Sequence, residues 1–122
     1  MNRIRTLSHS QRSVVFLDLA GCSPDVVAET LRKVPDFVAA QPRRSVLLLV
    51  DFTAASVDDD ALRAYQEAAV FDKPFIKKAA WIGASSLPES FRTMVSEFSL
   101  RDFPVFPTRA AALDWLTAED PA

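Results

Sequence analysis

Three residue types that carry much of protein chemistry are almost absent from this chain. It has two glycines, one cysteine and one histidine among 122 residues. Gly21 and Gly83 lie far apart, so no glycine-rich loop can bring backbone amides to a phosphate, as dinucleotide and P-loop sites require. The lone Cys22 excludes an internal disulfide, and we expect a small buried or half-buried thiol. Zinc binding or histidine-based catalysis would depend on His9 alone, which we expect to be solvated.

Charge and hydropathy also lack extremes. The formal net charge is −2, and the aromatic residues do not alternate with Lys or Arg, which is unlike a nucleic-acid-binding protein. The first apolar run, residues 14–20, is interrupted by Asp18 and is too short for a signal-peptide core or a membrane span. We therefore expect a soluble, cytoplasmic protein with no membrane span, no nucleic-acid partner and no cofactor.

What the chain does contain is a strand–helix pattern that occurs four times. Short β-rich runs occur at residues 13–20, 46–50, 75–83 and 103–107, and a helical pattern follows each of them. The run 46–50 is apolar without alternation, as in a central strand covered on both faces. Pro104 and Pro107 limit the ladder bonds of the last strand, which we place at a sheet edge. The pattern predicts one α/β domain over residues 1–122 with a mostly parallel sheet, and an extra N-terminal strand at residues 3–8.

Apolar stripes predict which side of each helix faces the sheet. In the first helix, Pro35 predicts a kink or a short break. Ser86, with Glu89 three positions later, predicts a capping box at the start of the third helix. Thr108 is expected to cap the last helix, in which Trp115 should pack onto the sheet. The predicted inward stripes are Val27, Leu31, Val34 and Val38; Leu62, Tyr65 and Ala69; and Phe91, Met94, Val95 and Phe98.

An acidic stretch, "DFTAASVDDD" at residues 51–60, is the main candidate for chemistry. Asp51 ends a buried strand, where the loop amides and the hydroxyls of Thr53 and Ser56 could satisfy its carboxylate. The run 58–60 opens a helix, where carboxylates cap the helix and favour its dipole. The alternative is a Mg²⁺ or phosphoryl-transfer site. A receiver-type site would also need paired acids after the first strand and a lysine on a late strand, and the sequence has neither. We expect no metal site.

The last third of the chain carries a family pattern. Residues 77–116 contain a strand of the form K-x-A-x-x-G, a helix, a short edge strand and a T-x-x-x-A-L-x-W-L helix, and residues 44–53, "RSVLLLVDFT", place a charged residue before an apolar strand ending in Asp. This layout resembles the SpoIIAA-like proteins, which are grouped with STAS and SEC14-type domains. The resemblance covers about residues 13–117. It implies a SpoIIAA-like (STAS-like) layered fold of successive strand–helix units.

The same resemblance implies how the acidic run differs from the family. The anti-sigma factor antagonists of this family carry D-S-S-G-L at the helix start, and a partner kinase phosphorylates the second serine. The matching segment here is residues 58–62, which places Asp60 at the phosphoacceptor position. The resemblance therefore implies an interaction module without the phosphorylatable serine.

Two functions are consistent with these patterns. The first is a non-enzymatic, STAS-like regulatory module whose protein partner docks around the start of the second helix. The second, suggested by the SEC14 side of the resemblance, is binding of a small apolar ligand or a lipid near the strand ends. A second copy of the chain could cover a sheet face that the helices leave open, giving a homodimer. The candidate partner-binding residues are Ser56, Asp58, Asp59, Asp60 and Arg63, and the candidate ligand-binding residues are Phe52, Phe71, Phe75, Trp81 and Phe106.

Overall fold

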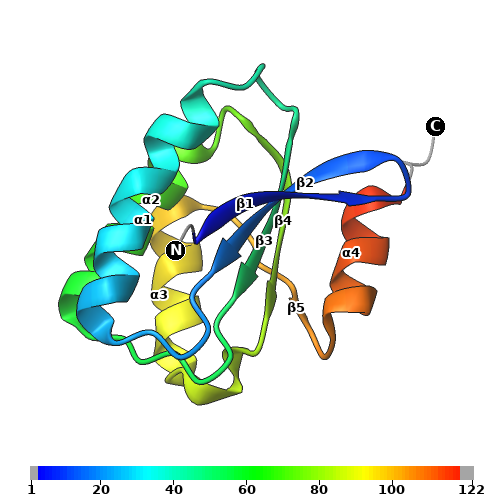
Figure 1. Ribbon diagram of the computed structural model, residues 1–122. Coiled ribbons are helices and arrows are strands. Elements are labelled where there is room, and N and C mark those ends of the chain that lie inside the picture. The colour runs from blue at the N-terminus through cyan, green and yellow to red at the C-terminus, as the bar shows by residue number, and fades with distance from the viewer. Residues whose placement is uncertain (1–2, 119–122) are drawn as a thin grey trace.

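A computed structural model describes residues 3–118 (Figure 1). The elements in chain order are β1 (Ile4–His9), β2 (Arg12–Asp18), α1 (Pro24–Ala39), β3 (Val46–Asp51), α2 (Asp59–Asp72), β4 (Ile76–Ile82), the 3₁₀ turn η1 (Ala84–Ser86), α3 (Glu89–Ser99), β5 (Val105–Phe106) and α4 (Arg109–Thr117). Within residues 3–118, no helix has the length and apolar character needed to cross a membrane.

One five-stranded sheet organises the chain in the order β1-β2-β3-β4-β5. The β1–β2 hairpin is antiparallel, and each remaining neighbouring pair is parallel. The mostly parallel sheet and the extra N-terminal strand are therefore confirmed. The short β5 pairs only with β4, because prolines flank its two residues, so its predicted place at the edge is confirmed as well.

Helices cover both faces of this sheet. Figure 1 shows α1, α2 and α3 on one face and α4 on the other. Every residue of β3 is buried, and its side chains alternate between two apolar clusters, with Leu48 under α1–α3 and Leu49 under α4. The second face is thus covered by the chain's own last helix, so the sheet does not need a second copy as cover.

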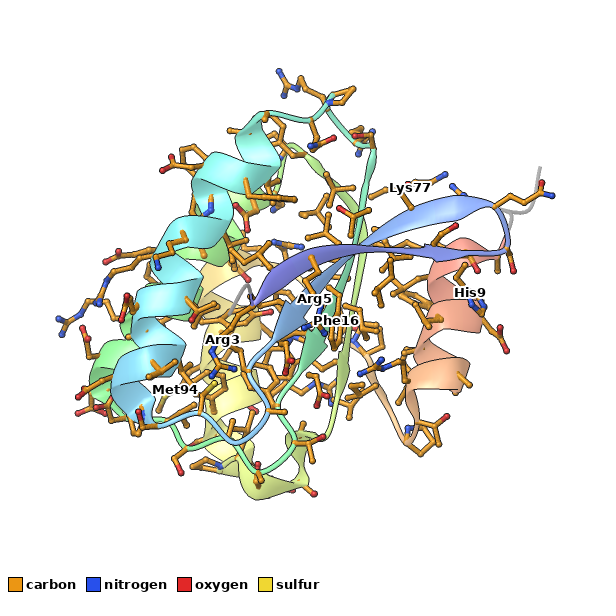
Figure 2. All side chains as sticks on the ribbon, in the orientation of Figure 1. Arg3, Arg5, His9, Phe16, Lys77 and Met94 are labelled. Carbon is orange, nitrogen blue, oxygen red and sulfur yellow. The ribbon has the colours of Figure 1, made fainter. Side chains whose placement is uncertain are left out.

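Polar side chains complete the cover over β2. The guanidinium of Arg5 lies 5.0 Å from the ring centre of Phe16, and that of Arg109 lies 4.6 Å from it. Figure 2 shows Arg5 beside Phe16, and it shows His9 beside α4. His9 stays at the surface, as expected, and its Nε2 lies 2.8 Å from a carboxylate oxygen of Asp114 in an exposed contact that joins β1 to α4.

Two predicted features of helix ends and interiors differ from the structure. The helix α1 continues through Pro35 without the short break that was one of the two predicted outcomes, because buried Val34 and Val38 hold its last turn against the sheet. Ser86 does not form a capping box with Glu89. It lies in η1 and Pro88 is the N-cap of α3, so the Ser86 hydroxyl bonds elsewhere. The predicted cap at Thr108 is confirmed, since its hydroxyl accepts from the amide of residue 111 at 3.1 Å.

Two predicted orientations also need correction. Phe91 and Val95 of α3 are buried, but Met94 and Phe98 point to solvent, so only half of the predicted stripe faces inward. Trp115 remains 36% exposed and lies against Phe106, with ring centres 5.4 Å apart. It covers the edge of the second apolar cluster and is not a buried residue between α4 and the sheet.

Gly83 provides a test of the packing at the end of β4. Both glycines have positive φ, +69° at Gly21 and +68° at Gly83, so alanine at either position should cost about 1 kcal/mol of backbone strain. A Cβ at Gly83 would also collide with the backbone and hydroxyl of Thr53, whereas a Cβ at Gly21 meets open space. We expect Gly83→Ala to lower the free energy of unfolding by a further ~1–3 kcal/mol relative to Gly21→Ala. Urea denaturation followed by circular dichroism measures both, and equal losses would contradict this packing.

Candidate docking surface

Three loops at the carboxyl ends of β2, β3 and β4 are joined into one rigid edge. The Gly21 amide donates to the Thr53 carbonyl at 2.8 Å, and the Ser56 amide donates to the Cys22 carbonyl at 3.0 Å. The Ser86 hydroxyl donates to two carbonyls of the β3–α2 loop, at 3.1 and 3.2 Å. Cys22 is buried inside this edge, as expected, and burial raises the pKa of its thiol. The polar backbone of these loops is therefore used mainly to fix the loops to one another.

Asp51 has a structural role at this edge. Its carboxylate is buried and accepts hydrogen bonds from the Thr53 amide at 2.9 Å and from the Thr53 hydroxyl at 2.6 Å. The prediction that the following loop satisfies this carboxylate is confirmed for Thr53. Because the group is bonded within its own loop, it holds the exit of the central strand in place.

The carboxylates at residues 58–60 differ in the groups that they contact. Asp58 is the N-cap of α2 and accepts from the Ala61 amide at 2.9 Å. Asp60 pairs with Arg32 of α1, with 2.6 Å between Nη2 and Oδ1. The hydrogen bond from that guanidinium lowers the pKa of Asp60. Among residues 3–118, no group of three or more His, Cys, Asp or Glu side chains is placed to hold a metal ion.

The five candidate partner-binding residues lie on one exposed stretch of surface. It runs from the end of the β3–α2 loop through the first turn of α2, beside α1. Asp58 caps α2 and Asp60 pairs with Arg32, so contacts within the protein account for both acids. Asp59 and Arg63 are exposed to solvent, as is Ser56. The sequence thus predicted the exposure of this stretch, and the structure adds its contact with α1.

The five candidate ligand-binding aromatics do not share one lining. Phe52 and Trp81 are fully buried and pack edge to face, with ring centres 4.8 Å apart. Phe71 and Phe75 stack on each other at 6.4 Å, at the end of α2. Phe106 belongs to the cluster on the opposite face of the sheet. The expected common pocket is wrong, because burial and sheet alternation distribute these rings over separate places.

A large open hollow lies in a place that no sequence pattern indicated. It has a volume of about 950 Å³ and lies along α3, η1 and β5. Met94 and Val105 line it and are 47% and 41% exposed. Leu87 and Pro88 add apolar surface, and Glu89 and Glu97 are among its charged residues. The outward orientation of Met94 adds to this apolar surface, and the predicted inward orientation of that residue concealed its contribution.

Several polar side chains lie inside the protein, between α2 and the end of α3. The Tyr65 hydroxyl accepts from the indole N–H of Trp81 at 2.7 Å, and burial raises the pKa of this tyrosine. Asp72 is 3% exposed, and one of its carboxylate oxygens has no hydrogen-bond partner among the described residues. Arg101 donates to the Ala69 carbonyl at 2.8 Å. Tyr65, Asp72 and Arg101 share a cavity of only about 10 Å³.

Comparison with known proteins identifies the fold. No family model matches the chain, and no curated protein does. A similar solved structure is that of an uncharacterized protein from the DUF3478 family with a SpoIIAA-like fold, from Shewanella loihica PV-4. The TM-score is 0.70 at 18% sequence identity, and the match covers 93% of this chain and 91% of that chain. The chain therefore has a SpoIIAA-like fold, as its motifs predicted.

The buried carboxyl of Asp72 should make the stability of the fold pH-dependent. Burial raises its pKa to about 7, with Arg101 acting in the opposite direction, whereas an unfolded aspartate titrates near 3.9. Between these two values the folded protein retains a proton that the unfolded chain has released. The free energy of unfolding should therefore fall as pH rises from about 4 to about 7, by at most ~1.4 kcal/mol per pH unit, and level off above.

Asp72→Asn isolates this contribution, because asparagine keeps the shape and cannot ionise. Urea denaturation at several pH values should show a smaller decline for this variant than for the wild type. The control is Asp36→Asn, which neutralises an exposed carboxylate of α1 and should leave the decline unchanged. An identical pH profile for Asp72→Asn and the wild type would show that Asp72 is ionised in the fold throughout.

Proposed function

We propose that this protein is a non-enzymatic interaction module that docks a protein partner on the side of α2 and α3. The observation that carries the proposal is the 950 Å³ hollow along α3, with the exposed apolar side chains of Met94 and Val105 in its lining. Exposed apolar surface bordered by polar groups is typical of protein interfaces, whose centres are apolar and whose rims are polar. Glu89 and Glu97 supply charged groups here.

The acidic start of α2 forms the second part of the same surface. The Ser86 hydroxyl joins η1, beside the hollow, to the loop that precedes α2. Further along, the Gln66 side chain donates to the Met94 carbonyl at 3.5 Å, which joins the middle of α2 to α3. We infer that a partner seated in the hollow would also contact exposed Asp59 and Arg63 of α2. We name these two parts together the docking surface.

Docking would not depend on a phosphorylation switch at residue 60. The resemblance to the anti-sigma factor antagonists places the phosphorylatable serine at residue 60, where this chain has the carboxylate of Asp60. That carboxylate is already paired with Arg32 at 2.6 Å. The docking surface would accordingly keep one charge state, with a permanent negative group where the antagonists gain one on phosphorylation.

Binding of a small apolar ligand has less support. The cavity beside Tyr65 and Phe103 has a volume of about 10 Å³, which is near the minimum for a single water molecule. A lipid or another apolar ligand would have to open the packing around Phe52 and Trp81. Native mass spectrometry of the purified protein tests this alternative directly, since a bound ligand adds its mass to that of the chain.

Site-specific photo-crosslinking tests the docking surface. A benzoylphenylalanine at Thr93, inside the hollow, and another at Asp59, on α2, should give adducts with the same partner in cells that naturally contain the protein. The control position is Lys33, on the outer side of α1. Met94→Arg places a charge in the hollow and should abolish both adducts, whereas Met94→Leu keeps the apolar surface and should preserve them. Equal adducts from Lys33, or adducts insensitive to Met94→Arg, would contradict the proposal.

A further inference from the structure

A cluster of cations lies at the end of the molecule where α1 and α2 terminate. Arg43, Arg44 and Lys73 line an open hollow of about 500 Å³, together with Val70 and Pro74. Figure 1 shows the α1–β3 and α2–β4 loops at this same end. The Arg44 amide donates to the Pro74 carbonyl at 3.0 Å, which fixes the two loops to each other. We name the surface formed by these residues and Phe71 the cationic pole.

Among the residues that the structure describes, no carboxylate lines the hollow of the cationic pole, although the whole chain carries a net charge of −2. The adjacent acid, Asp72, is buried and faces the internal cavity. Within residues 3–118, the side chains of Arg43, Arg44 and Lys73 make no ion pair or hydrogen bond. The positive charge is therefore open to an external anion.

Helix capping explains one of these cations and leaves the other two unexplained. Lys73 is the C-cap of α2, where the helix dipole favours a positive charge. Arg43 and Arg44 lie in the α1–β3 loop, so capping of a helix does not account for their positive charge. Arg44 also has a φ of +56°, a left-handed conformation that glycine or asparagine adopts with less strain. A long cationic side chain thus occupies a turn position that local structure alone does not favour.

Exposed apolar side chains adjoin the cations. Val70 and Phe71, in the last turn of α2, are 47% and 51% exposed. One side of Phe71 stacks on half-buried Phe75, which holds the ring at the surface. Cations beside exposed aliphatic and aromatic groups suit the boundary between lipid headgroups and acyl chains. A nucleic-acid backbone would use the cations but would gain little from aliphatic Val70 and Pro74.

We propose that the cationic pole binds the surface of an anionic phospholipid membrane. Arg43, Arg44 and Lys73 would contact the headgroups, and Phe71 with Val70 would enter the interfacial layer. Three cations and one aromatic ring give weak, reversible association, in which each cation strengthens binding by about fivefold at low salt. This inference does not depend on the docking surface, which lies along α3 and the first turn of α2.

Vesicle co-sedimentation of the full-length protein tests the inference. Vesicles that mix phosphatidylglycerol with phosphatidylcholine should bind the wild type, and added salt should weaken that binding. Vesicles of phosphatidylcholine alone should bind it much less. Lys73→Gln should weaken binding to the anionic vesicles by about fivefold, and Arg43→Gln with Lys73→Gln by about 25-fold. The matched control, Lys33→Gln, removes an exposed lysine of α1 and should have no effect.

The apolar contribution has its own matched pair. Phe71→Ser should weaken vesicle binding, whereas Phe98→Ser, which removes a similarly exposed ring from α3, should not. Thermal melts check that each variant remains folded. Absence of binding to anionic vesicles, or equal losses in Phe71→Ser and Phe98→Ser, would overturn the proposal. The proposal would also be overturned if the protein bound a DNA oligonucleotide tightly, or bound inorganic phosphate, and did not bind vesicles under the same conditions.

Discussion

The burial of β3 on both faces is the constraint on which the rest of the structure depends. Six consecutive residues, Val46–Asp51, are removed from water, so each face of the sheet must be covered. Helices α1–α3 cover one face, and α4 covers the other. The strand can end inside the protein because Thr53 satisfies the carboxylate of Asp51, and Gly83 lets β4 turn against that threonine.

This closed interior limits where the protein can bind anything. Beneath α2 and α3, two of the candidate ligand-binding rings, Phe52 and Trp81, pack into a continuous aromatic cluster with Tyr65, Phe91 and Phe103. Such packing stabilises the fold and leaves little room for a guest. The proposed interactions accordingly use the outer surface, where the open hollows and the exposed apolar side chains are found.

Helix α2 connects the two outer surfaces with opposite charge. Its start carries Asp58–Asp60 and its end carries Lys73, as the helix dipole favours. Because the dipole alone accounts for this order, the charges at the helix ends are weak evidence for binding. The stronger evidence is what the dipole does not require: the apolar hollow at Met94, and Arg43 and Arg44 in a separate loop.

Strand–helix alternation in the sequence predicted the fold because each apolar run and each cap is a local feature. The orientation of α3 could not be predicted in the same way. Phe91 with Val95 and Met94 with Phe98 are equally good apolar pairs at helical spacing. In the folded protein the first pair is buried and the second is exposed. The buried Ser99 hydroxyl lies on the same inward side and donates to the Val95 carbonyl at 2.7 Å. The cationic pole was equally hidden, because parallel pairing of β3 and β4 brings Lys73 next to Arg43 and Arg44.

One chain covers both faces of its own sheet, and the proposed docking surface stays open. Sedimentation equilibrium over a wide range of protein concentrations tests this most directly. The expected result is the mass of a single chain throughout, since neither sheet face requires a second copy. A dimer that persists on dilution and dissociates in Met94→Arg would contradict the claim, because the hollow on α3 would then already be occupied by another molecule of the same protein.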